Sequence, residues 1–216
     1  MSSDGSDVAQ LTSNSLYEEL SPSWSPAGTE IAFASTQDGG DFDIYVMDAA
    51  GQNVSRLTTD PGEDWFPAWS PDGSQIAFVS NRTGVGELYV MDTDGSNLTQ
   101  VTYNPDAEDT SYEVYGGGWG PEGVQFVLQM VRYGNSDIYI IDLSDGSEIQ
   151  LTFDEAWDFW PSWSPDGTTI AHSSDISGVP EIYAIAEDGA VTQLTSDSAV
   201  GSAGPTWSPD STMIAY

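Results

Sequence analysis

Apolar residues along this chain occur in short runs, such as Ile31–Phe33 and Ile76–Phe78, separated by turns rich in Gly, Pro, Asp and Ser. Short apolar or alternating runs bounded by turn residues are typical of β-strands. No stretch carries the 3.6-residue period of an amphipathic helix. The pattern therefore predicts an all-β protein.

The runs belong to a repeat. Variants of Trp-Ser-Pro-Asp-Gly begin at Trp24, Trp69, Trp119, Trp163 and Trp207, with spacings of 45, 50, 44 and 44 residues. A Leu-Thr or Val-Thr pair begins at positions 11, 57, 101, 151 and 194. An acid-apolar-Tyr triplet begins at Asp43, Glu87, Asp137 and Glu181. Three markers in constant order indicate a repeat architecture.

Each unit divides into four strands. The first ends at the Trp, and Ser-Pro-Asp-Gly forms a tight turn into the second. The third carries the acid-apolar-Tyr triplet, and the fourth ends at the Leu-Thr pair. Four strands in about 45 residues make a propeller blade. After a flexible acidic segment, 1–7, we expect one domain, 8–216, with blades near 21–60, 66–104, 116–154 and 160–196 and a partial fifth built from 205–216 and strand 8–13.

The fifth blade lacks a third strand. Residues 205–216 supply its first two strands and residues 8–13 its fourth. Neighbouring strands lie only about 4.8 Å apart, so these pieces cannot pair across the missing strand. An open edge of this kind is rarely left uncovered. The sequence predicts an incomplete ring, either part of a larger propeller or one of two chains that complement each other through the open blade.

The combined pattern resembles the TolB-like, or PD40, branch of WD40-like propeller repeats over residues 8–216. The resemblance implies a β-propeller fold. It leaves two functions open. One is a non-enzymatic scaffold that binds a protein or peptide. The other is the gating or docking propeller of a prolyl-oligopeptidase-like or tricorn-like peptidase whose catalytic domain lies outside this chain.

The charge is extreme. The chain has 3 Lys plus Arg and 35 Asp plus Glu, giving a net charge of −32. Without a basic surface it is not expected to bind nucleic acid or an anionic membrane, and no apolar run is long enough for membrane insertion. The absence of Lys predicts a halophilic protein, whose self-repulsion would be screened by molar salt. An acidic protein from an ordinary source is the alternative.

Few residues suit catalysis. The chain has no Cys and one His, His172. We expect His172 to fill an apolar slot of a second strand, where the other repeats carry Phe33 and Phe78. No Gly-x-Ser-x-Gly nucleophile elbow is present. We therefore expect no enzyme activity. Since residues 1–7 have no positive or apolar segment of a signal peptide, we expect a cytoplasmic location, or export if the sequence is a fragment.

The candidate binding site lies just before each Trp. Five residues before it stand Glu19, Asp64 and Asp158, followed by Leu20, Trp65, Tyr115 and Phe159 at the next position. The resemblance implies that these residues ring one mouth of the central channel. Acids beside aromatics would attract a basic peptide or Ca²⁺. Alternatively, the acids are solvated and support their loops.

Two further segments bear on this site. The third repeat has a longer loop, 104–118, and we expect Tyr112 and Glu113 to overhang the same mouth. The Asp-rich segment 38–43 lacks the spacing of an EF-hand loop. We interpret it as a turn, so the sequence predicts no cofactor, with Ca²⁺ the weak exception.

The charge predicts that folding depends on salt. We expect the melting temperature to rise markedly between about 0.1 M and about 2 M KCl, because the Debye length falls from about 10 Å to a few ångström. Calorimetry over this range tests the expectation. An unchanged melting temperature would contradict the halophilic interpretation.

Overall fold

The computed structural model describes residues 6–12, 16–196 and 201–216. Its regular structure is entirely β: four antiparallel sheets of four strands and one two-stranded hairpin. Within the described residues, no helix is present that could cross a bilayer. The prediction of an all-β propeller is confirmed, and the sheets do not close into a ring.

Each sheet is a simple meander in chain order. The first contains β1 (Glu19–Trp24), β2 (Glu30–Ser35), β3 (Asp43–Asp48) and β4 (Ser55–Arg56), and the second contains β5 (Asp64–Trp69), β6 (Gln75–Ser80), β7 (Glu87–Asp92) and β8 (Thr99–Gln100). The third contains β9 (Glu113–Trp119), β10 (Gln125–Arg132), β11 (Asn135–Asp142) and β12 (Glu148–Gln150), and the fourth contains β13 (Asp158–Trp163), β14 (Thr169–Ser174), β15 (Glu181–Ala186) and β16 (Val191–Gln193). The hairpin pairs β17 (Thr206–Trp207) with β18 (Ile214–Ala215).

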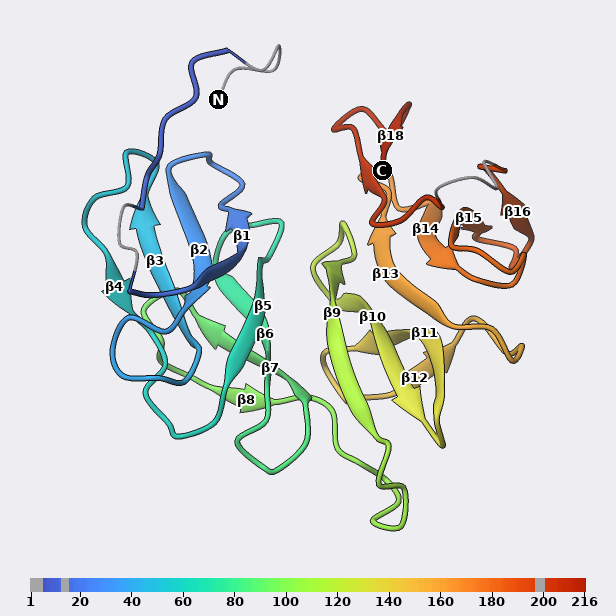
Figure 1. Ribbon diagram of the computed structural model, residues 1–216, viewed down its shortest axis with the longest axis horizontal. Coiled ribbons are helices and arrows are strands. Elements are labelled where there is room, and N and C mark those ends of the chain that lie inside the picture. Colours follow the sequence, from blue (N-terminus) through green and yellow to red (C-terminus); the bar gives the residue numbers. More distant parts are fainter. Residues whose placement is uncertain (1–5, 13–15, 197–200) are drawn as a thin grey trace.

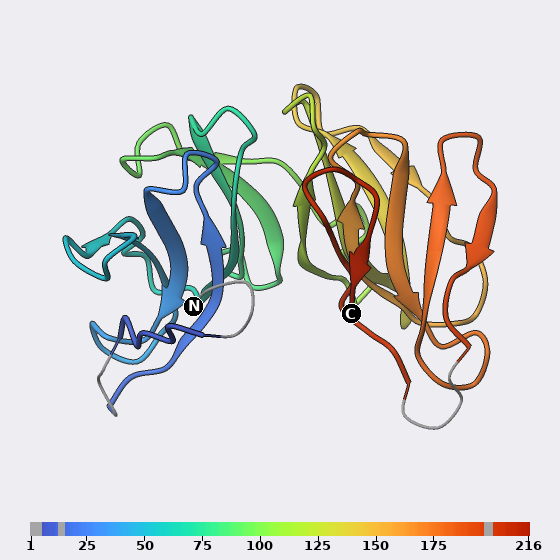
Figure 2. The ribbon, with the colours of Figure 1, turned by 90° about the horizontal axis from the view of Figure 1, so that it is seen from above.

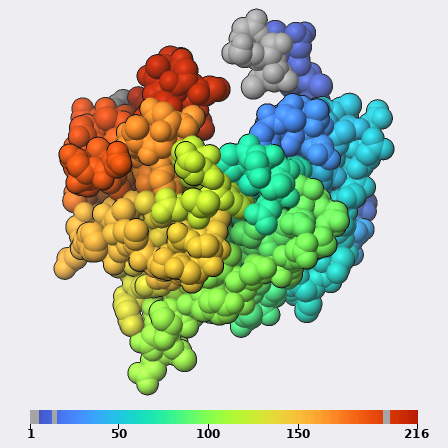
Figure 3. Space-filling model, turned by 180° about the vertical axis from the view of Figure 1, so that it is seen from behind, coloured from blue at the N-terminus to red at the C-terminus, as the bar shows by residue number. Residues whose placement is uncertain are grey.

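The sheets stand side by side as blades around an open arc (Figures 1 and 2). The first strands, β1, β5, β9 and β13, face the middle of the arc, and the short last strands lie on its rim. In the space-filling view of Figure 3, the C-terminal hairpin and the first blade stand on opposite sides of a notch. Every first strand is therefore available to line a common axis.

The predicted strand at 8–13 is wrong for the residues that the structure describes. Residues 8–12 form no strand, residue 13 lies outside the described residues, and so do residues 1–5 of the predicted N-terminal segment. A strand needs a neighbour to pair with, and no third strand stands beside this one. Leu11 instead lies against the turn of the first blade, where a Cβ on Gly51 would be 2.8 Å from the Leu11 carbonyl oxygen.

The hydrophobic core lies between blades. Ala32, Ala34, Ile44 and Val46 on one face of the first blade pack against residues of the second blade, among them Phe78. The other face of the second blade packs in the same way on the third. A four-stranded sheet has two apolar faces and no core of its own, so each blade is stable only against its neighbours.

A buried acid and a threonine join the last two strands of every blade. In the second blade, the Thr102 hydroxyl donates to Glu87 Oε2 over 2.6 Å and accepts from the Leu88 N–H over 2.8 Å. The same pair of bonds recurs in the other three blades, between Asp43 and Thr58, Asp137 and Thr152, and Glu181 and Thr195. This contact explains why the acid-apolar-Tyr and Leu-Thr markers repeat together.

Replacing one of these threonines should destabilise the protein. We expect Thr102→Val to lower the free energy of unfolding by about 2–3 kcal/mol, because it leaves the Leu88 N–H and a Glu87 oxygen without this partner. Denaturant unfolding in molar salt measures the change. Thr99→Val, at an exposed residue of β8, is the control. Equal stability of the two variants would show that the contact contributes little.

Candidate functional site

The first strands enclose a cavity of about 360 Å³ on the axis of the arc. Its walls come from all four complete blades and from the segment before β17. They carry three aromatic side chains and four prolines: Phe66, Tyr115, Trp160, Pro22, Pro67, Pro161 and Pro205. Ser and Gly residues supply most of the rest. No charged residue lines this channel among the described residues, although the chain carries 35 acids.

A β-bulge turns these side chains inward. The pairing register between the first and second strands of a blade shifts within β1, β5 and β13. The shift falls between Leu20 and Ser23, between Trp65 and Ala68, and between Phe159 and Ser162. The residue at the bulge has a left-handed backbone in all three, with φ of 51° at Ser21, 53° at Phe66 and 52° at Trp160. A bulky residue rarely adopts this conformation. Bulges redirect a side chain out of the normal alternation of a strand, and here they direct it to the axis.

Large and small residues alternate around the channel. Phe66 lies over the next blade at Gly116, where an added Cβ would sit 2.6 Å from the Phe66 Cβ. Trp160 lies in the same way near Gly204, at 3.7 Å. Phe66 and Trp160 nevertheless remain 37% and 53% exposed. The channel therefore presents apolar rings to an incoming molecule, each seated on a glycine.

Tyr115 reaches the channel by a displaced bulge. In β9 the shift falls between Val114 and Gly117, opposite Gln129, one residue earlier than in the other blades. Tyr115 thus takes the inward position that Phe66 and Trp160 occupy elsewhere, and it is 39% exposed. Of the six residues proposed from the sequence, Tyr115 is the one found in the wall of the channel.

The predicted ring of acids at the channel mouth is not formed. Asp64 and Asp158 are 0% and 1% exposed. Asp64 Oδ1 accepts from Arg82 over 3.0 Å, and Asp158 Oδ1 lies 3.5 Å from His172 Nε2. Glu19 is half-buried, and its carboxylate has no hydrogen bond or ion pair with the described residues. Asp64 and Asp158, the first residues of β5 and β13, point into their blades, because the inward turn occurs two residues later.

Burial raises the pKa of one of these acids and is outweighed at the other. It raises the pKa of Asp64 against the lowering effect of Ser80, Thr58 and Arg82. At Asp158 burial also opposes ionisation, but hydrogen bonds from His172, Ser174 and Thr152 outweigh it and lower the pKa. His172 occupies the aromatic slot that the sequence predicts. It pairs with Tyr183 across the sheet as Phe33 pairs with Tyr45.

The remaining predicted residues support the channel from behind. Trp65 packs against the core between the second and third blades. Phe159 stacks edge-on against Trp160 with ring centroids 5.1 Å apart, and Leu20 is exposed outside the channel wall. The signal that finds most of the lining is the X-Pro pair before the Trp in four of the five repeats: Ser21-Pro22, Phe66-Pro67, Trp160-Pro161 and Gly204-Pro205.

The long loop of the third blade does not overhang the mouth. Tyr112 is buried, and its hydroxyl donates to Glu87 Oε2 over 3.0 Å. Glu113 accepts the Gly86 N–H over 3.0 Å. In Figure 1 the loop between β8 and β9 extends away from the inner strands. The expectation for these two residues is wrong because both are used to join the second and third blades.

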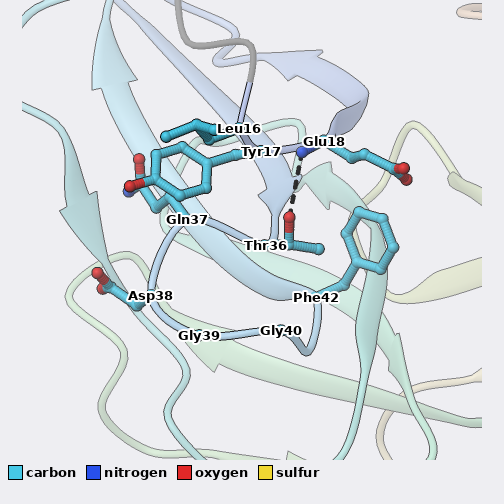
Figure 4. Close-up of a pocket in the computed structure, with 9 residues that line it drawn as sticks. All are labelled: Leu16, Tyr17, Glu18, Thr36, Gln37, Asp38, Gly39, Gly40 and Phe42. Carbon is cyan, nitrogen blue, oxygen red and sulfur yellow. Dashed lines mark hydrogen bonds between the residues drawn. The ribbon is translucent and has the colours of Figure 1, made fainter.

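A wider hollow of about 660 Å³ lies on the first blade, at the turn between β2 and β3 (Figure 4). Leu16 and Tyr17 form one wall, and the Glu18 N–H donates to Thr36 Oγ1 over 3.1 Å at its base. Two acids of the nearby turn already have partners. Asp38 accepts from the Tyr45 hydroxyl, and Asp43 pairs with Arg56. No group of three His, Asp or Glu side chains in the described ranges is arranged to hold a metal ion.

Comparison with known proteins assigns the family. The chain matches the TolB beta-propeller domain, PD40, over residues 5–117 and 109–216, and it belongs to this family. The structure of putative TolB from Agrobacterium tumefaciens is 28% identical, with a TM-score of 0.75 over 90% of this chain and 66% of that chain. TolB from Acinetobacter baumannii is also 28% identical, with a TM-score of 0.79 over 99% of this chain and 52% of that chain.

A more distant likeness shows the fold alone. Puromycin hydrolase is 18% identical, with a TM-score of 0.71 over 89% of this chain and 33% of that chain. No curated protein matches by sequence. The chain thus spans between about half and two thirds of the length of the two TolB structures.

The buried acids predict how stability depends on pH. The folded state raises the pKa of Asp43, Asp64, Glu87 and Asp137, mainly by burial. At these groups it therefore binds more protons than the unfolded chain, and in molar salt stability should rise as pH falls from neutral towards the ordinary pKa of carboxyl groups, about 4. Turn acids have lowered values, with the pKa of Asp72 at about 2. Their contribution is lost between about pH 4 and 2.

Unfolding midpoints at neutral, weakly acidic and strongly acidic pH measure this profile. Glu87→Gln, which removes one titrating group and keeps an acceptor for Thr102, should reduce the rise in stability below neutral pH. A stability that falls steadily from pH 7 downwards would contradict the assignment.

Proposed function

We propose that this TolB-like propeller is a scaffold that binds an extended peptide segment of a partner protein in the axial channel, without turnover. The observation that carries the proposal is the uncharged lining of the channel in a chain of net charge −32. In a protein of this composition, acidic residues are expected over the whole surface. A surface free of them is explained if that surface binds apolar side chains.

The shape and chemistry of the lining favour a peptide. Exposed Phe66, Tyr115 and Trp160 offer ring faces, and the prolines between them make a stiff, pre-ordered wall. Grooves lined by aromatic side chains are typical of sites that bind extended, proline-containing segments, because such a segment loses little conformational entropy on binding. Phe66 and Trp160 also hold a strained backbone, and such strain is concentrated at binding sites.

The partner differs from the one that the sequence suggests. Asp64 and Asp158 are paired inside their blades, so the channel wall itself offers no carboxylate to a basic segment. The general field of the chain still attracts cations at low salt. We therefore propose that apolar and aromatic side chains of the partner provide most of the affinity, and that basic residues affect only its approach.

In the alternative function, a docking propeller of a peptidase, the same channel would admit a substrate to a catalytic domain outside this chain. The binding measurement separates the two functions, because a scaffold retains a peptide in the channel whereas a gating propeller allows it to pass.

The test begins with peptides of 12 residues selected from a random displayed library on the folded chain in molar salt. We expect Phe66→Ala and Trp160→Ala each to weaken binding of a selected peptide at least tenfold by calorimetry, about 1.4 kcal/mol or more. Phe153→Ala, at an exposed aromatic outside the channel, should leave binding unchanged. Mass spectrometry should recover the peptide intact.

Affinities that match the parent in both channel variants would place the site elsewhere. A cleaved peptide would overturn the proposal of binding without turnover. Failure to select any peptide would also count against the channel as a peptide site, provided that the chain is folded under the selection conditions.

A further inference from the structure

The outer ends of the blades meet through a repeated contact. The carbonyl of the residue before Thr lies against a turn glycine of the next blade. An added Cβ would come within 2.8 Å of the Leu11 oxygen at Gly51, 2.8 Å of the Leu57 oxygen at Gly95 and 3.0 Å of the Val101 oxygen at Gly146. Three successive junctions of this kind are therefore closed by backbone packing. The junction between the third and fourth blades can be compared with them.

The junction between the third and fourth blades is open. Its equivalent residues are Leu151 and Gly189, and an added Cβ on Gly189 would meet nothing within 4 Å. A cavity of about 310 Å³ lies there instead, between Leu151 and Ile140 on one side and Ile170 and Ile185 on the other. The apolar residues at this junction form a small cluster separate from the larger cores of the first three blades.

Trp163 is placed differently from Trp119 and Trp207, its counterparts in the third and fifth repeats. The indole N–H of Trp119 donates to the Ala68 carbonyl of the preceding blade over 2.9 Å, and that of Trp207 donates to the Ser162 carbonyl over 3.1 Å. Trp163 instead donates to Gly167 of its own turn over 3.2 Å. Its ring lies on Gly120, 3.2 Å from where a Cβ would be, at the position where other repeats carry Ser. Trp163 thereby forms one wall of the cavity.

One charged group stands at the rim. Glu187 lines the cavity, is exposed, and has no ion pair with the described residues. No cationic side chain lines the cavity in the part of the chain that the structure describes. An apolar wall that holds an indole, beside a single carboxylate, suits a ligand with a flat ring and a short cationic arm. A cavity of about 150 Å³ already accommodates benzene.

We propose that the junction between the third and fourth blades is a binding site for a small aromatic amine. The ring lies between Trp163 and the Ile and Leu side chains, and the ammonium group pairs with Glu187. This site is separate from the axial channel and does not rest on the function proposed for it.

The probe is 2-phenylethylamine, titrated into the folded chain at the lowest salt concentration that preserves the fold. We expect binding by calorimetry, together with a change in tryptophan fluorescence that is lost in Trp163→Phe. The anionic analogue 3-phenylpropanoate should bind at least tenfold more weakly, because Glu187 repels it.

Two variants test the geometry. Glu187→Gln should weaken the amine at least threefold, whereas Asp188→Asn, the same charge change at the neighbouring residue outside this cavity, should not. Leu151→Trp should fill the cavity and abolish binding, with the fold checked by its melting temperature. Phe66→Ala should bind the amine as the parent does.

Absence of binding by the parent, or equal binding by Glu187→Gln and the parent, would overturn the proposal. Should Leu151→Trp fail to fold, the Glu187→Gln and Asp188→Asn pair still decides it, because both substitutions are at exposed residues.

Discussion

The bond between a buried carboxylate and a threonine holds the rim of each blade. The last strand of a blade is only two or three residues long, so it cannot satisfy the backbone at the start of its neighbour. The threonine hydroxyl accepts that N–H and donates to the acid in front of it. A carboxylate buried there carries nearly the full desolvation penalty unless it is hydrogen-bonded. The repeat therefore keeps both residues together in all four blades.

This rim leaves the inner strands free to vary. Because the outer strands and the packing between blades fix each sheet, β1, β5 and β13 can each carry a bulge with a left-handed residue. The bulge converts an ordinary strand position into one that faces the axis. Large residues at Phe66 and Trp160 are then matched by glycines in the next blade. The result is an aromatic, uncharged channel in an otherwise acidic protein.

Much of the fold could be predicted from the sequence, because its determinants are local and repeated. The Trp-Ser-Pro-Asp-Gly motif forms the turn after each first strand and the short apolar runs form the second and third strands, while the Leu-Thr or Val-Thr pair directly follows each last strand. Residues 8–12 were not predictable in this way. Their sequence is that of a last strand, but a strand forms only where a neighbour can pair with it.

The site was less predictable, because it depends on register. Counting residues back from the Trp of each repeat places Asp64 and Asp158 at the start of their strands. The count does not show that a bulge two residues later changes which side chains face the axis. Asp64 and Asp158 therefore lie inside the blades, and Phe66 and Trp160 lie in the channel. Tyr115, one of the residues proposed from the sequence, lies in the channel wall only because its own bulge is displaced by one residue.

Hydrogen exchange of the folded chain, with and without a selected peptide, tests the central claim most directly. Binding in the channel should slow exchange in the inner strands around residues 20–23, 65–68, 115–117 and 159–162 together, and should leave the rim strands unchanged. Protection confined to the rim strands or to the turn at 36–42 would contradict the account, because it would show that the peptide binds outside the channel.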